Sequence, residues 1–450
     1  MRATTRVFLA LACTFLVSPA GGAALQAGVS KVDITPPVGG KMAGYSDRGA
    51  KVSTGVHDPL MAKALVLKDD DTALAIVTMD LVGVPSECLV PIKNGIREKT
   101  GVEQVMLLVS HTHSGPDGTP DFPSAEKPWI KELERKIIDA VVAAHGALVP
   151  IRYGVGKGSA AEGHNRRKVN SDGTVEMLWR NAERVPTVPV DHMVGVIRFE
   201  KEDGSPLATL VNFTCHAVVL GPENLEISAD YPGVMTKAVE SELGGVCMFA
   251  QGACGDINPF MDKTAPKDGA FEEVEKMGKA VAKEVVRVSK TLTARDGANA
   301  RLTATTEVVP IKLRWDLSDP EVVAAIEKHY GAMFARPILD RIKRELAGEI
   351  AGGLVTVTLG DDTAIVGWPG EFFVQYGLDL KARCKIPNTF VFGYCNKTFA
   401  YFPTIDGAWQ GGYGGKEATF VAVGTGDEFL TKSLVNLYYQ TGRLSRVPMF

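Results

Sequence analysis

The sequence of 450 residues lacks the features that mark several classes of protein. Its 49 basic residues are nearly balanced by 53 acidic ones, the net charge is −4, and no basic stripe occurs, so nucleic acid is not an expected partner. No two cysteines have the CxxC spacing, which argues against a structural zinc site made of thiolates. No repeat or composition shift divides the chain, and its 47 glycines and 25 prolines are scattered at turns, so we expect a folded chain and not a disordered one.

Long hydrophobic runs are scarce as well, and the clearest one lies near the N-terminus. Arg2 and Arg6 precede the apolar stretch and small residues follow it, which is the pattern of a cleavable secretory signal peptide over residues 1–24. A lipoprotein anchor at Cys13 is a poorer alternative, because leucines lie four and two residues before that cysteine instead of three. We therefore expect an exported protein, periplasmic or secreted, that has no integral membrane segment.

Cysteine is also scarce beyond the signal peptide. Export permits disulfides, but six cysteines in a chain of this length do not make a disulfide scaffold. We expect mainly buried free thiols and leave one bridge open, because pairing cannot be read from spacing. The six are Cys88, Cys215, Cys247, Cys254, Cys384 and Cys395.

Hydrophobic periodicity predicts an α/β protein. Helical periodicity covers residues 132–146 and 271–288, a further helix is expected within 319–348, and another after Pro369-Gly370. Because the predicted strands are continuous apolar runs, they should be covered on both faces. We expect one large domain over residues 25–450, with a mixed β-sheet core flanked by helices. The predicted strands are 62–67, 72–80, 105–110, 194–200, 208–215, 245–251, 354–359, 363–368 and 389–394.

Histidine numbers only eight, so two histidines one residue apart are informative. The segment VMLLVSHTHSGPD, residues 105–117, runs from an apolar strand into His111 and His113 before Gly115 and Pro116 interrupt it. On an extended strand, residues i and i+2 point to the same face, so both imidazoles can reach one cavity. Taken alone, such a pair is more often structural than metal-binding.

Further polar residues follow other predicted strands or tight turns, where α/β proteins place their chemistry. Each of them alone has an ordinary structural explanation. Glu371, for example, would be a first-turn acid favoured by a helix dipole if a helix began there. The group comprises His216 after an apolar strand, Asp256 and Asn258 in a glycine-rich turn, Glu371 after Pro369-Gly370, and Tyr401 and Tyr413 in a loop-rich stretch.

Taken in order, these motifs resemble the catalytic domain of the neutral/alkaline non-lysosomal ceramidases. The likeness spans about residues 27–430, and both the order and the spacing of the motifs agree. It implies the fold of that catalytic domain. The motifs are DITPP, HDPL, SHTHSGP, NRR, TCH, SADYPG, GACGDINP, PGEF and NKTFAYFPT.

The resemblance also implies a zinc site and a set of residues around it. Matched motif by motif, the zinc ligands are His111, His216, Glu371 and Tyr401, while His113 and Arg166 line the substrate side and Tyr413 faces the scissile carbonyl. Such a metal lowers the pKa of water toward about 7 and polarises a carbonyl. Arg166, Tyr413 and His113 would then stabilise the developing oxyanion or protonate the leaving amine.

Two departures weaken the expectation of a sphingolipid substrate. Where the family has a serine in its Gly-Asp-x-Ser-Pro turn, this chain has Asn258, which would orient or bind substrate, or simply cap the turn. We also expect a short member without the C-terminal immunoglobulin-like domain of longer ceramidases. That domain would have supplied a surface that could help meet lipid aggregates.

Three functions stay open on the sequence. The first is an exported zinc amidase that cleaves the N-acyl bond of ceramide or a related N-acylated lipid, with peripheral lipid contact. The second keeps the zinc site but acts on an N-acyl sugar, an ester or a glycan. The third is a non-catalytic zinc- or ligand-binding protein, which the retention of Arg166 and Tyr413 disfavours. No oligomeric state is predicted.

Overall fold

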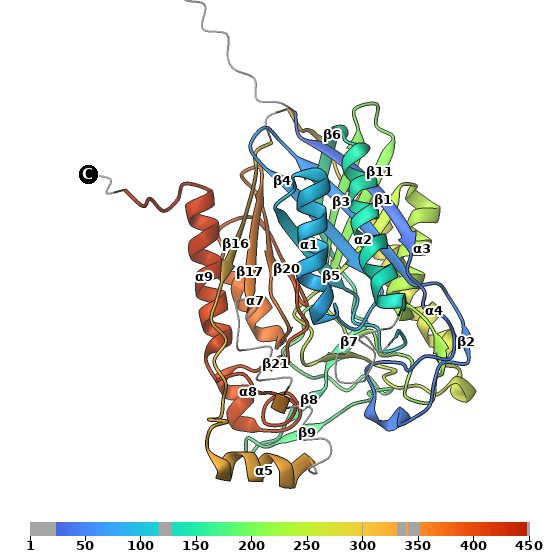
Figure 1. The fold of residues 1–450 in the computed structure, drawn as a ribbon, viewed down its shortest axis with the longest axis vertical. Helices are drawn as coiled ribbons and strands as arrows, with labels where there is room; N and C mark the ends of the chain where they lie inside the picture. The colour runs from blue at the N-terminus through green and yellow to red at the C-terminus, as the bar shows by residue number, and fades with distance from the viewer. Residues whose placement is uncertain (1–23, 117–127, 299, 331–338, 341–351, 448–450) are drawn as a thin grey trace, which may run out of the picture.

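The computed structural model describes residues 24–116, 128–298, 300–330, 339–340 and 352–447. Within these residues two β-sheets pack face to face, and helices cover the outer face of each sheet, so the molecule has four layers (Figure 1). The predicted α/β fold, with a mixed sheet core flanked by helices, is confirmed. The core contains two sheets, which the apolar runs of the sequence do not distinguish.

The larger sheet has nine strands and is mixed. Its strands are β1 (Gln26–Asp33), β3 (Met61–Lys68), β4 (Ala73–Met79), β5 (Gln104–Val109), β6 (Val149–Ser159), β10 (Met193–Lys201), β11 (Pro206–Phe213), β13 (Val246–Gln251) and β15 (Arg295–Asp296). The hydrogen-bonded order is β13-β11-β10-β6-β1-β3-β4-β5, with β15 on β6. The β11–β13 and β4–β5 pairs are parallel and the others antiparallel. Parallel pairing at the two edges therefore places the carboxyl ends of neighbouring strands together.

The smaller sheet has four strands and lies on the other side of the core. Its strands, in the order in which they pair, are β16 (Leu302–Val308), β17 (Gly353–Leu359), β18 (Thr363–Gly367) and β20 (Asn388–Phe392). Four short strand pairs lie outside both sheets. They are β2 (Gly55–Val56) with β12 (Glu226–Ile227), β7 (Gly163–Asn165) with β14 (Ile257–Pro259), β8 (Arg167–Val169) with β9 (Val175–Met177), and β19 (Glu371–Phe372) with β21 (Tyr401–Phe402).

Helices form the two outer layers. Helices α1 (Ser86–Thr100), α2 (Pro128–Gly146), α3 (Asp230–Leu243) and α4 (Ala270–Thr291) cover the nine-stranded sheet, and α7 (Val374–Arg383) and α9 (Thr425–Gln440) cover the four-stranded one. Helices α5 (Pro320–Tyr330) and α8 (Ile405–Gln410) lie near the short strands at the lower end of the view (Figure 1). Two short 3-10 turns, η1 (Ser46–Arg48) and η2 (Pro266–Asp268), complete the elements.

Alternation along the strands explains the layers. In β3, Ala64 and Val66 belong to the core shared with the helices, whereas Leu65 and Leu67 belong to the core between the two sheets. Successive side chains of a strand point to opposite faces, so a strand buried on both sides needs apolar residues at every position. Each fully buried valine or leucine among them contributes roughly 1.5–3 kcal/mol of transfer free energy. This is why the continuous apolar runs became central strands.

The structure corrects the sequence analysis at Glu371. This residue does not begin a helix but lies in the short strand β19, and α7 starts three residues later, at Val374. The interpretation of Glu371 as a first-turn acid is therefore wrong. Within the region 319–348, α5 spans Pro320–Tyr330, and residues 331–338 and 341–348 lie outside the described residues.

The expectations for the cysteines and the membrane have different outcomes. The six cysteines among the described residues are all free and buried, as expected for most of them, and none forms the bridge that was left open. No helix among the described residues combines the length and apolarity needed to cross a membrane. The predicted signal peptide falls almost entirely on residues 1–23, which lie outside the described residues.

Candidate metal centre and active site

The nine-stranded sheet brings His111 and His216 together although they follow β5, at one end of the strand order, and β11, next to the last strand at the other end. His111 comes two residues after β5, and His216 three residues after β11. Gln251, the last residue of β13, donates from Nε2 to the carbonyl of Ser110 at 3.2 Å and to that of Cys215 at 2.6 Å. Each of these carbonyls belongs to the residue just before a histidine. The amide of Gln251 therefore joins the two edges at the point where the imidazoles emerge.

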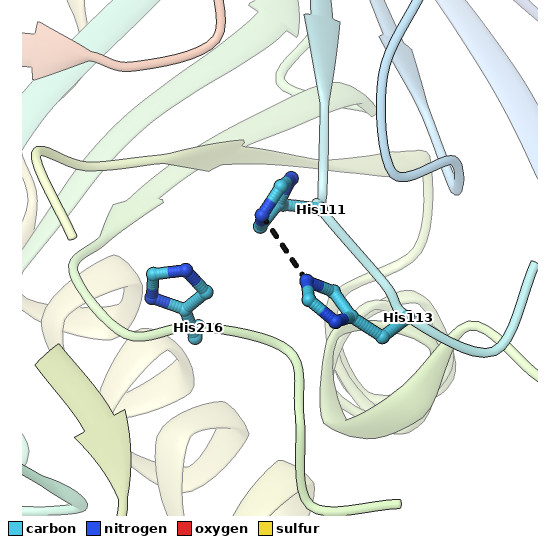
Figure 2. A group of neighbouring side chains, drawn as sticks. All are labelled: His111, His113 and His216. Atoms are coloured by element: carbon cyan, nitrogen blue, oxygen red, sulfur yellow. Dashed lines mark hydrogen bonds between the residues drawn. The ribbon is translucent and has the colours of Figure 1, made fainter. Parts of the chain in front are cut away.

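Backbone carbonyls fix the orientation of both imidazoles. Nδ1 of His111 lies 2.6 Å from the carbonyl oxygen of Val82, and Nδ1 of His216 lies 3.0 Å from that of Ile257. A carbonyl can only accept, so each Nδ1 carries the proton and each Nε2 presents a lone pair. Metal-binding histidines commonly donate their other ring nitrogen to such a partner. Figure 2 shows the rings of His111, His113 and His216 gathered around a common space.

All three imidazoles are held neutral. Burial lowers the pKa of His111 to about 4, although the carboxylate of Glu371 opposes the shift. Burial and the charge of Arg166 lower the pKa of His216 to about 3. Burial and the two neighbouring histidines lower the pKa of His113 well below its usual value. Neutral imidazole is the form that binds metal ions.

Glu371 supplies a carboxylate to the same space. Its Oε2 lies 3.2 Å from Nε2 of His216 and 3.7 Å from Nε2 of His111. Glu371 pairs in parallel register with Tyr401 through β19 and β21. Burial, followed by the charge of Glu371, raises the pKa of the Tyr401 phenol well above its usual value. Three of the four zinc ligands that the resemblance implies, His111, His216 and Glu371, are thus close together. The fourth, Tyr401, lies on the strand that pairs with that of Glu371.

His113 could replace Glu371 as the third metal-binding group beside His111 and His216. Its Nε2 lies 3.2 Å from Nε2 of His111, and the donor atoms of His111, His113 and His216 all lie within 4.8 Å of one another. Its Nδ1 is buried and has no hydrogen-bond partner among the described residues. Gly44 packs so tightly here that a Cβ atom would lie 2.3 Å from the ring of His113. The geometry therefore admits either Glu371 or His113 beside His111 and His216.

Arg166, Asn258 and Tyr413 also meet at this site. Arg166 donates to Oδ1 of Asn258 at 3.0 Å and to the carbonyl of Gly255 at 2.7 Å. Its guanidinium carbon lies 5.3 Å from the ring centroid of Tyr413 and 5.4 Å from that of Tyr401. Burial lowers the pKa of Arg166, but the neighbouring Tyr401, Tyr413 and Glu371 raise it by more, so the guanidinium stays charged.

Two aromatic residues that touch the site are not among the candidates that the sequence offered. The ring of Tyr394 stacks on His111 with centroids 4.2 Å apart, and its hydroxyl lies 3.0 Å from Sγ of Cys254. The ring of Trp179 lies 5.0 Å from the guanidinium carbon of Arg166. Tyr394 ends a predicted strand as the histidines do, so the same positional signal could have found it. Trp179 carries no such signal.

Three residues in or next to the site have a strained backbone. His111, Tyr394 and Lys263 have φ values of 63°, 53° and 53°, a region that residues with a Cβ atom rarely adopt. Residues held in such conformations persist where the surrounding structure fixes them, and they cluster at functional sites. The donor set, the neutral imidazoles and the charged Arg166 suit a bound divalent metal beside a group that binds an oxygen of the substrate.

The chain is similar in sequence to neutral ceramidases. A model of the neutral/alkaline non-lysosomal ceramidase N-terminal family matches residues 25–299. Neutral ceramidase A of Dictyostelium discoideum is 26% identical over 269 residues, which is 54% of this chain and 37% of that protein. The neutral ceramidase of Pseudomonas aeruginosa is 26% identical over 275 residues, 56% of this chain and 40% of the relative. These matches span about two fifths of the curated relatives' length.

The likeness in structure extends further along the chain. The crystal structure of neutral ceramidase from Pseudomonas aeruginosa superposes with a TM-score of 0.69 at 18% identity, covering 95% of this chain and 76% of that one. A structure of ceramidase complexed with C2 gives the same TM-score and identity, and this chain covers 77% of it. Glu371, Tyr401 and Tyr413 lie beyond residues 25–299, which the family model matches, and the structural likeness at 18% identity shows the fold alone.

Proposed function

Because the chain belongs to the neutral/alkaline non-lysosomal ceramidase family, we propose that it is a zinc-dependent amidohydrolase. Its substrate is ceramide or a related N-acylated lipid, and the bond cleaved is the N-acyl amide. The observation that carries the proposal is the pair of Nε2 lone pairs of His111 and His216, each fixed by a carbonyl on Nδ1 and both facing the carboxylate of Glu371. Such a donor set suits Zn²⁺.

His111, His216, Glu371 and Tyr401 would hold the zinc ion. When bound, it polarises the substrate carbonyl and lowers the pKa of water toward about 7, which supplies a nucleophile at neutral pH. The neutral His111 and His216 need lose no proton to bind the metal. The phenol of Tyr401 is the ligand whose pKa, raised by burial and by Glu371, must fall for it to bind as a phenolate.

The other site residues act on the substrate. Arg166 stays charged and donates to the acyl oxygen as negative charge develops there. Tyr413 presents its phenol to the same oxygen. His113 is neutral, so it can take a proton from the attacking water and return it to the leaving amine. Asn258 holds Arg166 through its Oδ1.

A lipid substrate is supported by the outer side of the loop that carries the site tyrosines. Helix α8 lies between Tyr401 and Tyr413, and on it Ile405 is 60% exposed and Trp409 is 76% exposed. Tryptophan combines a large apolar ring with a polar N–H and suits a lipid–water boundary. We propose peripheral contact with lipid at this surface, which in sequence lies between the two tyrosines.

The test of the function uses the purified protein with known zinc content. Short-chain ceramide, an N-acyl hexosamine, a simple ester and a glycan panel are incubated separately, and the released fatty acid or amine is measured. Hydrolysis of ceramide that depends on one zinc per chain supports the proposal. Zinc-dependent turnover of another substrate alone would replace the substrate and keep the chemistry. A protein that binds zinc but hydrolyses none of the panel would favour a binding role.

Export is proposed separately. We propose that residues 1–24 are removed as a signal peptide and that the mature protein is periplasmic or secreted. The mass of the protein recovered from the periplasm of a bacterial expression host measures this directly. Full-length mass, or a protein found only in the cytoplasm, would contradict it.

A further inference from the structure

A buried acid lies behind Arg166 and is reached through one intervening side chain. Oδ1 of Asn258 accepts from Arg166 at 3.0 Å, and Nδ2 of the same amide donates to Oδ2 of Asp262 at 2.8 Å. The side chain of Asp262 has no exposed surface, and its Oδ1 has no hydrogen-bond partner among the described residues. A guanidinium and a carboxyl group are therefore bridged by a single neutral amide.

The two partners fix which way the amide points. An amide carries an acceptor on one side and donors on the other, and turning it over would set Nδ2 against the guanidinium and Oδ1 against the carboxylate. Either clash would bury an unsatisfied polar group, which is strongly unfavourable. Arg166 donates only, and the ionised Asp262 accepts only, so one orientation of Asn258 satisfies both. In that orientation the acceptor of Asn258 always faces Arg166.

The bridge is part of a closed ring of contacts around Arg166. Nζ of Lys263 lies 3.6 Å from Oδ2 of Asp262 and 3.7 Å from the centroid of the Trp179 ring. The Trp179 ring in turn lies 5.0 Å from the guanidinium of Arg166. Lys263 holds the rare positive φ noted above, as expected for a residue whose surroundings fix it. Asp262 thus contacts Asn258, which accepts from Arg166, and also Lys263. Lys263 in turn packs on Trp179, the aromatic neighbour of Arg166.

We propose that Asp262 is a positioning residue, which acts through Asn258 to hold the Arg166 guanidinium in the place where it binds the acyl oxygen. The inference rests on the proposed amide hydrolysis for its consequence, but the contacts that carry it are independent of the metal. It also gives a reason for asparagine at position 258. A serine there would have to meet both partners with one oxygen, whereas the amide reaches each partner with a different atom.

The first experiment compares Asp262→Asn with the wild type on whichever N-acyl substrate the wild type hydrolyses. The variant keeps the size of the side chain, but its amide can donate as well as accept, so Asn258 is free to turn over. We expect kcat to fall about 10-fold or more with KM within about threefold, because misplacing a group that acts in the transition state lowers kcat. Zinc content should stay at the wild-type level.

The matched control is Asp191→Asn. Asp191 is also a buried acid, and it pairs with Lys381 and Thr214 instead of the Arg166 network. This variant should lose stability and keep the wild-type kcat per folded molecule. A fall in kcat of equal size in Asp191→Asn would overturn the proposal, because any buried acid would then produce the effect.

A double-mutant cycle tests whether Asp262 acts through Asn258. In the Asn258→Ser background the bridge is absent, so Asp262→Asn should lower kcat by less than about threefold. Equal effects in both backgrounds would show that Asp262 does not act through the amide, and would overturn the proposal.

A binding measurement separates this proposal from the proposed function. Hexanoate, a fatty-acid carboxylate, is titrated into the zinc-loaded wild type and into Arg166→Ala, Asp262→Asn and Asp191→Asn. We expect about 10-fold weaker binding in the first two variants and unchanged binding in the third. If Arg166→Ala weakens binding and Asp262→Asn stays within twofold of the wild type in both Kd and kcat, only the role of Asp262 fails. A wild type that neither hydrolyses N-acyl substrates nor binds hexanoate overturns both proposals.

Discussion

The candidate site has two sides that are built differently. On the histidine side, His111 and His216 follow β5 and β11 of the nine-stranded sheet, and Gln251 and two backbone carbonyls fix their orientation. On the tyrosine side, Glu371 and Tyr401 come from β19 and β21, which are only two residues long. The histidine side is therefore prearranged by the core. The tyrosine side depends on a local pairing and on the loop that also presents Trp409 to solvent.

This difference indicates that the two sides contribute unequally to metal binding. A donor set that the sheet holds in place should dominate metal affinity, because little ordering is left to occur on binding. The side made of short strands and loops is less firmly held, and its loop also carries Tyr413, which the proposed function places against the acyl oxygen. Variants on the histidine side should therefore lower the metal content more than variants on the tyrosine side.

The largest effect is expected on the histidine side. His111→Ala and His216→Ala should each lose bound zinc and all measurable hydrolysis, because each removes a preoriented lone pair. Elemental analysis after gel filtration measures the metal. His145→Ala, which changes a histidine on α2, is the control and should keep full zinc. Full zinc in both site variants would exclude these residues as ligands.

His113 decides between the two donor sets. If Glu371 is the third metal ligand beside His111 and His216, the His113→Ala variant should keep its zinc but hydrolyse substrate more slowly. If His113 is itself a ligand, the variant loses both. We expect the first result, since His113 is then the neutral base proposed above.

Next in size are changes of the groups that act on the acyl oxygen. Arg166→Ala and Tyr413→Phe should each lower kcat by about 10² to 10³, the usual cost of removing one oxyanion donor. Zinc content and melting temperature should stay near those of the wild type. Variants that melt early yet keep wild-type turnover would show that the two residues are structural.

On the tyrosine side, Tyr401→Phe should weaken zinc binding less than Glu371→Gln. The phenol must lose a proton that burial and Glu371 hold in place, so its net contribution to affinity is small. Competition with a chelator measures both variants. If Tyr401→Phe lost zinc as completely as His216→Ala, the contrast between the two sides would be broken.

Stability should show a pH dependence that arises away from the metal. Burial raises the pKa of Asp230 to about 7 from 3.8, although it accepts hydrogen bonds from the backbone of Leu220 and Tyr231. The stabilisation by its proton is complete below the unfolded pKa and is lost as pH rises through the folded pKa. The wild type should therefore lose free energy of unfolding between pH 4 and 7, whereas Asp230→Asn should not. The difference between the two proteins should change over this range by at least about 1.4 kcal/mol in favour of the variant, which is the value of one pKa unit. Urea unfolding at both pH values measures the difference, and parallel curves would contradict it.

The smallest effect is expected at the exposed end of the tyrosine side. Trp409→Ala should lower the rate on ceramide in phosphatidylcholine vesicles by a few-fold and leave the rate on a short-chain soluble substrate unchanged, because the loss of one interfacial side chain weakens adsorption and not chemistry. Val308→Ala, at an exposed valine of β16, is the control. Equal loss on both substrates would place Trp409 in the catalytic loop instead of at a lipid surface.

Much of this protein could be read from the sequence because its signals are local. Every predicted strand is present, since a strand buried on both faces needs an unbroken apolar run, as in β3 and β5. The motif order also placed His111, His216, Glu371 and Tyr401 as candidates, and the structure brings them to one region. Glu371 was nevertheless placed at a helix start, because a two-residue strand leaves no periodic pattern.

What only the tertiary structure decided concerns contacts between distant segments. Gln251 joins the residues before His111 and His216, and Asp262 reaches Arg166 through Asn258, yet neither residue carries a pattern that marks its partner. The packing of the second sheet on the first also depends on contacts between distant segments. An apolar run predicts that a strand is buried, but it does not indicate which element covers the strand. Local composition fixes which residues are buried or lie at strand ends. The tertiary structure selects their partners, because hydrogen bonds and donor sets form between groups that are close in space and remote in the chain.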